Sequence, residues 1–309
     1  MDKRDKIVWL VVLVLLVAFP AVGLSRYLQR VSSLIFIYMI LALSLNIITG
    51  YMGQVSLGHA AFYAIGAYTS SLLSEHFGWN FLLTCLCAVL MTGFIGWLFS
   101  IPTMKLSGTY LAIITMGFGE IVKVLIINWE SLTHGTYGVQ RIARPEFFGV
   151  EMKTTNNGMY YLCLVFVVLT VLFCIAIERS KLGRTLRAIK DDPMAASLMG
   201  ININKVISIT FFIGGALAAV SGICYASAYP QVDVYMGSWL GNMSFVSAVL
   251  GGIGDIRGAM LGGFILGIAQ IFATAINSTF GYAVGFIILI VILLVKPAGI
   301  MGRLVVEKV

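Results

Sequence analysis

The sequence predicts an all-α polytopic membrane protein with about ten transmembrane helices. Of the 309 residues, 60% are hydrophobic and only 11% are charged, whereas a soluble domain is about 45–50% apolar and about 25% charged. Such a chain cannot cover its surface with polar groups, so membrane lipid must be its solvent. Apolar runs of roughly 18 or more residues recur, each long enough to cross about 30 Å of hydrocarbon. We find no alternating strands of the kind that would indicate a β-barrel.

Ten apolar segments are expected to cross the bilayer within a single transmembrane domain that covers residues 1–309. The first, residues 7–24, resembles a signal peptide with a cleavage site at residues 21–23, but its length favours an uncleaved span. The others cover residues 31–49, 52–73, 81–102, 109–129, 159–177, 206–229, 243–254, 258–277 and 280–295.

The distribution of basic residues predicts the topology. With Met1 in the cytoplasm, most of the 20 Lys and Arg residues fall on the cytoplasmic side of these ten spans. The positive-inside rule therefore places the loop at residues 130–158 outside the cytoplasm and the loop at residues 178–205 inside it. The net charge of +7 thus reflects membrane topology and does not indicate nucleic acid.

The stretch from Gly50 to Ser71 differs from the other spans because it is rich in Gly, Ala, Ser and Tyr. It also carries Gln54, Ser56 and His59, which survive in a bilayer only where they face protein or a wet path. The sequence therefore predicts a broken or closely packed helix that lines a solute route. His59 is a candidate proton relay or solute donor, or else a neutral histidine hydrogen-bonded between helices.

A second Gly-rich stretch, Gly251–Gly267, follows an ordinary span in the second half of the chain. Paired interrupted segments point to a binding site between two repeated halves. Glycines spaced four residues apart let helices approach closely, so we expect helix packing at Gly251, Gly252, Gly254, Gly258 and Gly262. No P-loop motif is present, so this chain is not expected to bind ATP, and no spacing indicates a metal site.

Glu120 lies well inside the fifth span, where a charge costs about 2.5–3.5 kcal/mol on insertion scales. It must therefore be paired, protonated or close to water. Lys123, three residues later, is a candidate partner. Two interpretations stay open: a structural pair near the outer interface, or a role in the solute path.

The loop at residues 178–205 predicts two short helices. Leu182, Leu186 and Ile189 repeat at helical spacing, which is typical of an amphipathic helix on the membrane or on a partner. The charged side chains that point elsewhere are Arg184, Arg187 and Lys190.

A second helix is expected to start at Asp191-Asp192-Pro193, with Asp192 as N-cap and Pro193 at the first helical position. Ala195 and Ala196 would form a small-residue face, and Gly200 suits the C-terminal stop. We interpret the two helices as a docking element for a cytoplasmic subunit. The alternative is a plain solvated loop.

Several motifs together resemble the M-type permease subunits of the branched-chain amino acid (Liv) ABC importers. They are GYMGQVSLGHAAFYAIGAYTSSLL at 50–73, TYLAIITMGFGEIV at 109–122, WESLTHGTYGV at 129–139, SKLGRTLRAIKDDPMAASLMGI at 180–201, VLGGIGDIRGAMLGG at 249–263 and ILLVKPAGIMG at 292–302. The resemblance covers nearly the whole chain beyond the first span. Ala259 stands where family members usually have proline, and Asp255 and Arg257 are more charged than usual there.

The resemblance implies a multi-pass subunit of the bacterial cytoplasmic (inner) membrane, without a cofactor of its own. Its partners would be a LivH-like sister permease, two LivG- and LivF-like ATPases that hold ATP and Mg, and an extracytoplasmic binding protein. The coupling segment would span Arg184–Gly200. Candidate path residues are Gln54, Ser56, Gly58, His59, Tyr68, Thr115 and Glu120.

Other functions remain open from the sequence. Sister families with this fold carry urea, short amides or other amino acids. An ion-coupled secondary transporter would use Glu120 and His59. An intramembrane enzyme is disfavoured, because no paired nucleophile and base and no HExxH motif is found.

Overall fold

The computed structural model describes residues 14, 16–22, 26–140, 145–147, 150–152, 157–229 and 231–302. Its helical elements are η1 (Phe19–Val22), α2 (Arg26–Leu45), the π-helix η2 (Asn46–Tyr51), α3 (His59–Phe77), α4 (Phe81–Thr103), α5 (Gly108–Asn128), α6 (Glu130–Thr133), η3 (Gly135–Tyr137), α7 (Gly158–Arg179), α8 (Lys181–Asp191), α9 (Pro193–Leu198), α10 (Ile203–Ala228), α11 (Tyr235–Gly251), α12 (Ile256–Ile276) and α13 (Ser278–Val295). Strand β1 (Val139–Gln140) pairs antiparallel with β4 (Gln231–Val232), and β2 (Glu146–Phe147) pairs with β3 (Val150–Glu151).

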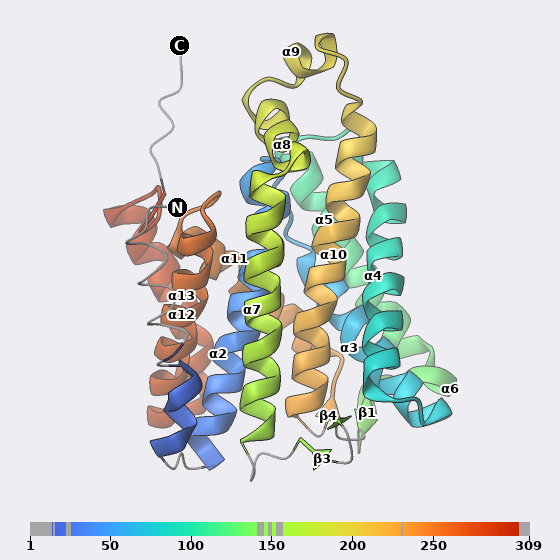
Figure 1. Cartoon of the computed structure of the whole chain (residues 1–309), viewed down its shortest axis with the longest axis vertical. Coiled ribbons are helices and arrows are strands. Elements are labelled where there is room, and N and C mark those ends of the chain that lie inside the picture. Colours follow the sequence, from blue (N-terminus) through green and yellow to red (C-terminus); the bar gives the residue numbers. More distant parts are fainter. Residues whose placement is uncertain are drawn as a thin grey trace.

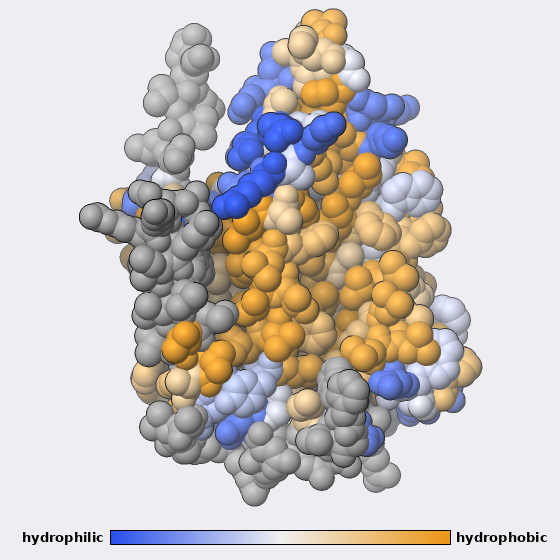
Figure 2. Space-filling model, in the orientation of Figure 1, coloured by the Kyte–Doolittle hydropathy of each residue, from blue (hydrophilic) through white to orange (hydrophobic). Residues whose placement is uncertain are grey.

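The long helices form an all-α bundle with α8 and α9 at one end and α6 and the short strands at the other (Figure 1). The loops at residues 130–158 and 178–205 therefore lie at opposite ends of the molecule. Hydrophobic side chains cover the middle of the face shown in Figure 2, and hydrophilic ones gather beside α8. This pattern is that of a multi-pass membrane protein.

Among the described residues, 6 helices are long and apolar enough to cross a membrane by length and composition. They are Leu28–Tyr51, Phe81–Thr103, Gly108–Asn128, Gly158–Arg179, Ile203–Ala228 and Ile256–Ile276. The predicted count of about ten is thus not confirmed. Most of the first predicted span, residues 7–24, lies outside the described residues, and α11 has only 17 residues.

The core is built on α2 and α10, whereas α5 lies at the edge. The most apolar window of Leu28–Tyr51 is 89% buried, against 22% for Gly108–Asn128. Glycines bring helices close: an added Cβ at Gly222 of α10 would lie 2.2 Å from the Tyr63 carbonyl oxygen of α3. Small residues serve this purpose in membranes because lipid supplies no hydrophobic force between helices.

The third predicted span, residues 52–73, begins later in the structure. Residues 52–58 are not helical, and α3 starts at His59 and continues to Phe77. Gly53 has φ +76°, which a right-handed helix does not permit. The chain therefore enters α3 through a non-helical segment, residues 52–58.

The eighth predicted span, residues 243–254, also differs, because α11 already begins at Tyr235. Asp233 Oδ1 accepts hydrogen bonds from the Tyr235 and Met236 amides, both at 2.8 Å. This capping starts α11 eight residues before residue 243, the predicted start of the span.

Candidate functional site

The π-helix η2 joins the two Gly-rich stretches of the sequence. Asn46 Oδ1 accepts a hydrogen bond from the Gly254 amide at 2.8 Å, and Asn46 Nδ2 donates one to the Asp255 carbonyl at 3.2 Å. An added Cβ at Gly50 would lie 2.7 Å from the Gly254 amide nitrogen. All residues of η2 are buried, and single π-turns of this kind occur frequently at functional sites.

The non-helical segment at residues 52–58 is hydrogen-bonded to α5 through Thr115. The Thr115 hydroxyl accepts a hydrogen bond from the Leu57 amide at 3.0 Å and donates one to the Ala112 carbonyl at 2.9 Å. An added Cβ at Gly58 would lie only 1.7 Å from the Thr115 carbonyl oxygen. Only glycine can therefore occupy the position before α3, and the structure brings the predicted residues Gly58 and Thr115 together.

His59 is buried between helices. Its Nε2 lies 2.7 Å from Ser44 Oγ of α2, and the residue is 1% exposed. This agrees with the interpretation of a histidine hydrogen-bonded between helices. Among the described residues, three buried atoms at the start of α3 lack a hydrogen-bond partner: His59 Nδ1, Ser56 Oγ and Gln54 Oε1. Such atoms are expensive unless water or a solute satisfies them.

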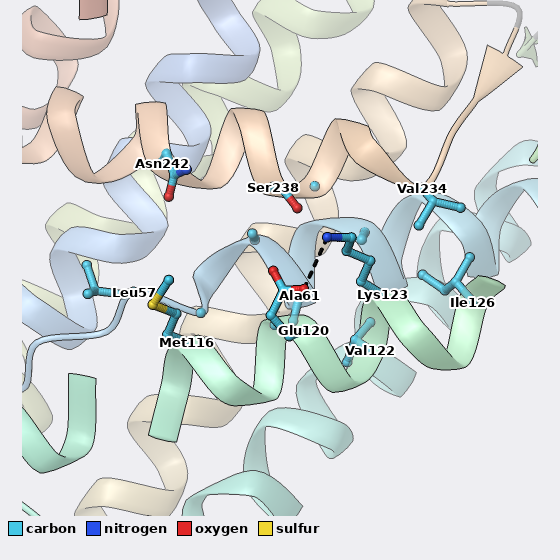
Figure 3. A pocket seen from close by; sticks show the side chains of 15 residues that line it. Leu57, Ala61, Met116, Glu120, Val122, Lys123, Ile126, Val234, Ser238 and Asn242 are labelled. Atoms are coloured by element: carbon cyan, nitrogen blue, oxygen red, sulfur yellow. Dashed lines mark hydrogen bonds and ion pairs between the residues drawn. The ribbon is translucent and has the colours of Figure 1, made fainter. Parts of the chain in front are cut away.

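Glu120 and Lys123 form the expected pair, with Lys123 Nζ 3.1 Å from Glu120 Oε2. They line a pocket of about 80 Å³ between α3, α5 and α11, whose wall also includes Met116 and Ser238 (Figure 3). Lys123 Nζ also lies 5.8 Å from the centre of the Tyr235 ring. Both side chains of the pair are partly exposed on α5.

Tyr68 does not belong to this group. Its hydroxyl donates to the Val232 carbonyl at 3.5 Å, beside the β1–β4 end of the bundle. Tyr68 is about 14 Å along α3 from His59 at about 1.5 Å per residue. The structure therefore divides the predicted path residues into a group near the start of α3 and one distant tyrosine.

The two short helices of the 178–205 loop are present as α8 and α9. Leu186 and Ile189 are buried, and Leu182 packs against the core. Asp192 Oδ1 accepts from the Met194 and Ala195 amides at 2.8 and 3.0 Å. The predicted N-cap, with Pro193 at the first helical position, is thus confirmed.

The predicted coupling residues separate by what they contact. Arg184 Nη1 donates to the Arg179 carbonyl at 3.2 Å, and Arg187 Nη2 donates to the Glu178 carbonyl at 3.1 Å. These two arginines therefore bind the last carbonyls of α7, where a positive charge is favourable. Asp191 is exposed and Ala196 is buried. Gly200 has φ +82°, as a helix stop requires.

Lys190 corrects the sequence interpretation, which grouped it with outward-facing charges. Its Nζ donates to the Gly50 carbonyl at 2.8 Å. An added Cβ at Gly254 would lie 3.6 Å from Lys190 Nζ. Lys190 therefore joins α8 to the point where the two Gly-rich stretches meet. The signal was available, because Leu182, Leu186 and Lys190 are spaced four residues apart and share one helical face.

The far end of α9 carries apolar side chains that the sequence analysis did not select. Met194, Leu198 and Met199 are 77%, 83% and 83% exposed. Two of them belong to α9 and the third is its C-cap, and α9 lies at the end of the molecule beyond α8 (Figure 1). An exposed apolar group of this kind at a protruding tip indicates a protein-interaction surface.

The glycines predicted for packing have two different roles. Added Cβ atoms at Gly251 and Gly262 would each lie 1.9 Å from carbonyl oxygens, those of Gly258 and Ser247, so these residues let α11 and α12 pack closely. Gly252 and Gly254 belong to the turn between the helices, and their φ values are +110° and +103°. The predicted four-residue ladder thus begins at Gly258. Within the described part of the chain, no group of three potential metal ligands is found.

Comparisons with known proteins place this geometry in a family. A family model described as "Branched-chain amino acid transport system / permease component" matches residues 27–295. The chain is 33% identical over 292 residues to the high-affinity branched-chain amino acid transport system permease protein LivM of Escherichia coli (strain K12), covering 86% of this chain and 68% of that protein.

The permease protein LivH of the same Escherichia coli system is 32% identical over 290 residues, with 88% of this chain and 93% of that protein covered. The permease protein BraD of Pseudomonas aeruginosa (strain PAO1) is 31% identical over 303 residues, with 88% and 94% covered. The match extends from α2 to the end of α13, so it includes the break before α3, the pocket and the α8–α9 segment. The chain therefore belongs to the family of permease components of branched-chain amino acid transport systems.

Proposed function

We propose that the chain is the membrane-spanning subunit of an ATP-driven importer that brings leucine, isoleucine and valine into the bacterial cytoplasm. It works with a sister permease, two cytoplasmic ATPases that bind ATP and Mg, and an extracytoplasmic binding protein. The end with α8 and α9 faces the cytoplasm, as does the N-terminus. The names and activities of the relatives support the substrate class.

The observation that carries the proposal is the α8–α9 segment. Its tip exposes Met194, Leu198 and Met199, and its base is bonded to the permease interior through Lys190. An ATPase that grips the tip would move α8, and Lys190 would transmit that movement to Gly50 and the break before α3. Such an element connects two distant sites, as coupling between ATP binding and solute access requires.

The test is reconstitution of the chain with its partner permease, ATPases and binding protein in proteoliposomes. We expect leucine uptake that requires ATP, the partner permease, both ATPases and the binding protein. Uphill uptake by the chain alone, driven by a proton or sodium gradient, would contradict the proposal. Uptake of urea or short amides in place of leucine would keep the machinery and change the substrate.

A second variant tests the docking tip directly. Met194→Glu combined with Leu198→Glu places charges on the exposed face of α9 without touching the Asp192 cap. We expect loss of ATPase copurification while the permease itself keeps its thermal stability. As a control, Tyr137→Glu places the same charge on a side chain that is 77% exposed in η3, outside the helices that are long enough to cross the membrane. Unchanged ATPase binding in the tip variant would exclude α9 as the docking site.

A further inference from the structure

We propose that Glu120 and Lys123 form a head-group site for a zwitterionic amino acid, in which Lys123 binds the carboxylate and Glu120 binds the ammonium group. The site is the pocket between α3, α5 and α11 (Figure 3). This inference rests on the proposed function in amino-acid import and names where the solute binds in the permease.

The first argument is chemical complementarity. Lys123 Nζ and Glu120 Oε2 lie 3.1 Å apart and line the same pocket. A free amino acid carries the same two opposite charges on one carbon atom, so each end can replace one partner of the pair. Pairs of this kind three residues apart on a helix are weak, so a solute can open the pair readily. Urea and short amides carry no charge, so they cannot replace either partner of the ion pair.

The second argument is the size and lining of the pocket. Its volume of about 80 Å³ exceeds the roughly 10–15 Å³ of accessible space that one water molecule needs, so a charged head group can enter it. The wall next to the charges is apolar, with Leu57, Met116 and Val234. An aliphatic side chain can therefore lie along this wall while the head group occupies the charged part.

The third argument is the position of the pair on α5. Glu120 lies about 18 Å from the Gly108 end of the helix at about 1.5 Å per residue, within the span Gly108–Asn128. Its side chain is 57% exposed, on a helix whose most apolar window is only 22% buried. A charge exposed to lipid at this depth is unfavourable. This face of α5 therefore borders water or a second protein subunit, and the pocket opens onto that boundary.

The fourth argument is that small and polar residues line the pocket around the ion pair. Gly58, Gly119 and Gly237 line the pocket, so at these three positions no side chain narrows it. Gly58 precedes α3 and makes no side-chain cap, so the positive end of the α3 dipole adds to the attraction for a carboxylate. Ser238 and Asn242 on α11 supply further polar groups on the same pocket wall.

The experiment uses the complete reconstituted complex and four variants. Glu120→Gln and Lys123→Met each remove one charge, and Glu120→Lys combined with Lys123→Glu exchanges them. Glu75→Gln is the matched control, because Glu75 forms an exposed pair with His134 at 3.3 Å outside the pocket. Copurification of partners and thermal stability are measured beside ATP-dependent leucine uptake.

We expect each single variant to lose at least about tenfold in leucine uptake, since a charge-assisted contact to the solute is removed. The exchanged variant regains pairing and wild-type thermal stability but not uptake, because the two charges now meet the solute in reversed order. Glu75→Gln transports normally. Wild-type uptake in the exchanged variant, or in both single variants, would show a purely structural pair and overturn the proposal.

A second measurement does not depend on altering the pair. Met116→Cys places a thiol in the pocket wall, and its rate of labelling by a methanethiosulfonate reagent is compared with that of the parent complex. We expect leucine to slow labelling, whereas 4-methylpentanoate and 3-methylbutylamine, which each lack one charge, do not. Equal protection by the three compounds, or none, would overturn the head-group site.

The wild-type arm separates the two levels of inference. If wild-type complex imports leucine and the tests of the pair fail, only the head-group site is wrong. If wild-type complex imports an uncharged solute and no amino acid, both the site and the proposed substrate class are wrong.

Discussion

The two Gly-rich interruptions of the bundle, residues 52–58 and 252–255, both lie beside Lys190 but differ in how they satisfy their polar groups. In the second, Asp255 Oδ1 accepts from the Arg257 and Gly258 amides and starts α12, and Asn46 binds both sides of the turn. In the first, Ser56 Oγ and Gln54 Oε1 have no partner among the described residues. Similar composition thus builds a closed turn in one place and an open polar break in the other.

This difference indicates which of the two interruptions can change its hydrogen bonds. A turn with its hydrogen bonds complete can stay still while helices pack around it. A break with unpartnered buried groups is poised to exchange bonds with water or solute. Lys190 reaches both, since an added Cβ at Gly53 would lie 3.1 Å from its Cγ and one at Gly254 would lie 3.6 Å from its Nζ. We therefore expect the closed turn to act as the fixed support and the segment before α3 to move with α8.

The largest effect is expected from glycine replacements that test both interruptions sterically. Gly58→Val meets the Thr115 carbonyl, and Gly251→Val meets the Gly258 carbonyl, so each should destabilise the permease by about 3 kcal/mol or more. Melting temperature in lipid nanodiscs measures this. Gly117→Ala is the control, because an added Cβ there has no neighbour within 4 Å, and it should be neutral or stabilising by up to about 1 kcal/mol. Tolerance of both valines would refute the close packing.

The next effect is expected at the connection itself. Asn46→Ala removes two hydrogen bonds and leaves the partly buried Gly254 amide without its partner. We expect a loss of about 2–3 kcal/mol in unfolding free energy and faster hydrogen exchange in both interruptions. Asn128→Ala, at an exposed asparagine on α5, serves as control and should change little. Faster exchange in only one interruption would show that Asn46 does not join them.

A smaller effect is expected from Lys190→Met, which keeps all but the last heavy atom of the side chain's length and removes its bond to Gly50. The bond is partly exposed, so its contribution is about 1 kcal/mol, or roughly a fivefold change in an equilibrium. We expect normal ATPase binding but more ATP hydrolysed per leucine imported. Lys181→Met, at the exposed start of α8, is the control. An unchanged ratio of ATP to leucine would remove Lys190 from the coupling route.

The smallest effect sharpens the contrast between open and closed regions. Ser56→Ala removes a hydroxyl that has no partner in the part of the chain that the structure describes, so stability should change by less than about 0.5 kcal/mol. Ser247→Ala, on α11, removes a hydroxyl that donates to the Met243 carbonyl at 2.8 Å and should cost about 1 kcal/mol. Reduced uptake in Ser56→Ala with unchanged stability would place Ser56 on the solute route. A large loss of stability would show instead that its hydroxyl has a structural partner.

Some local features could be predicted because they depend on neighbouring residues. The α9 start follows from Asp192 and Pro193, and the Glu120–Lys123 pair follows from its three-residue spacing. Asp255 as the cap of α12 was equally readable, although its charge drew attention only as a departure from the family pattern. By contrast, the bond between Lys190 and Gly50 joins residues 140 positions apart, and no local rule connects them.

The sequence by itself determined the all-α membrane class, the capped α8–α9 segment and the polar character of residues 50–71, because hydropathy, capping and composition act over short stretches of chain. The tertiary structure decided where the third span breaks, which charges face inward and which glycines turn or pack. These features depend on contacts between distant segments, such as Gly58 on Thr115 and Asn46 on Gly254, and such contacts exist only once the helices have packed.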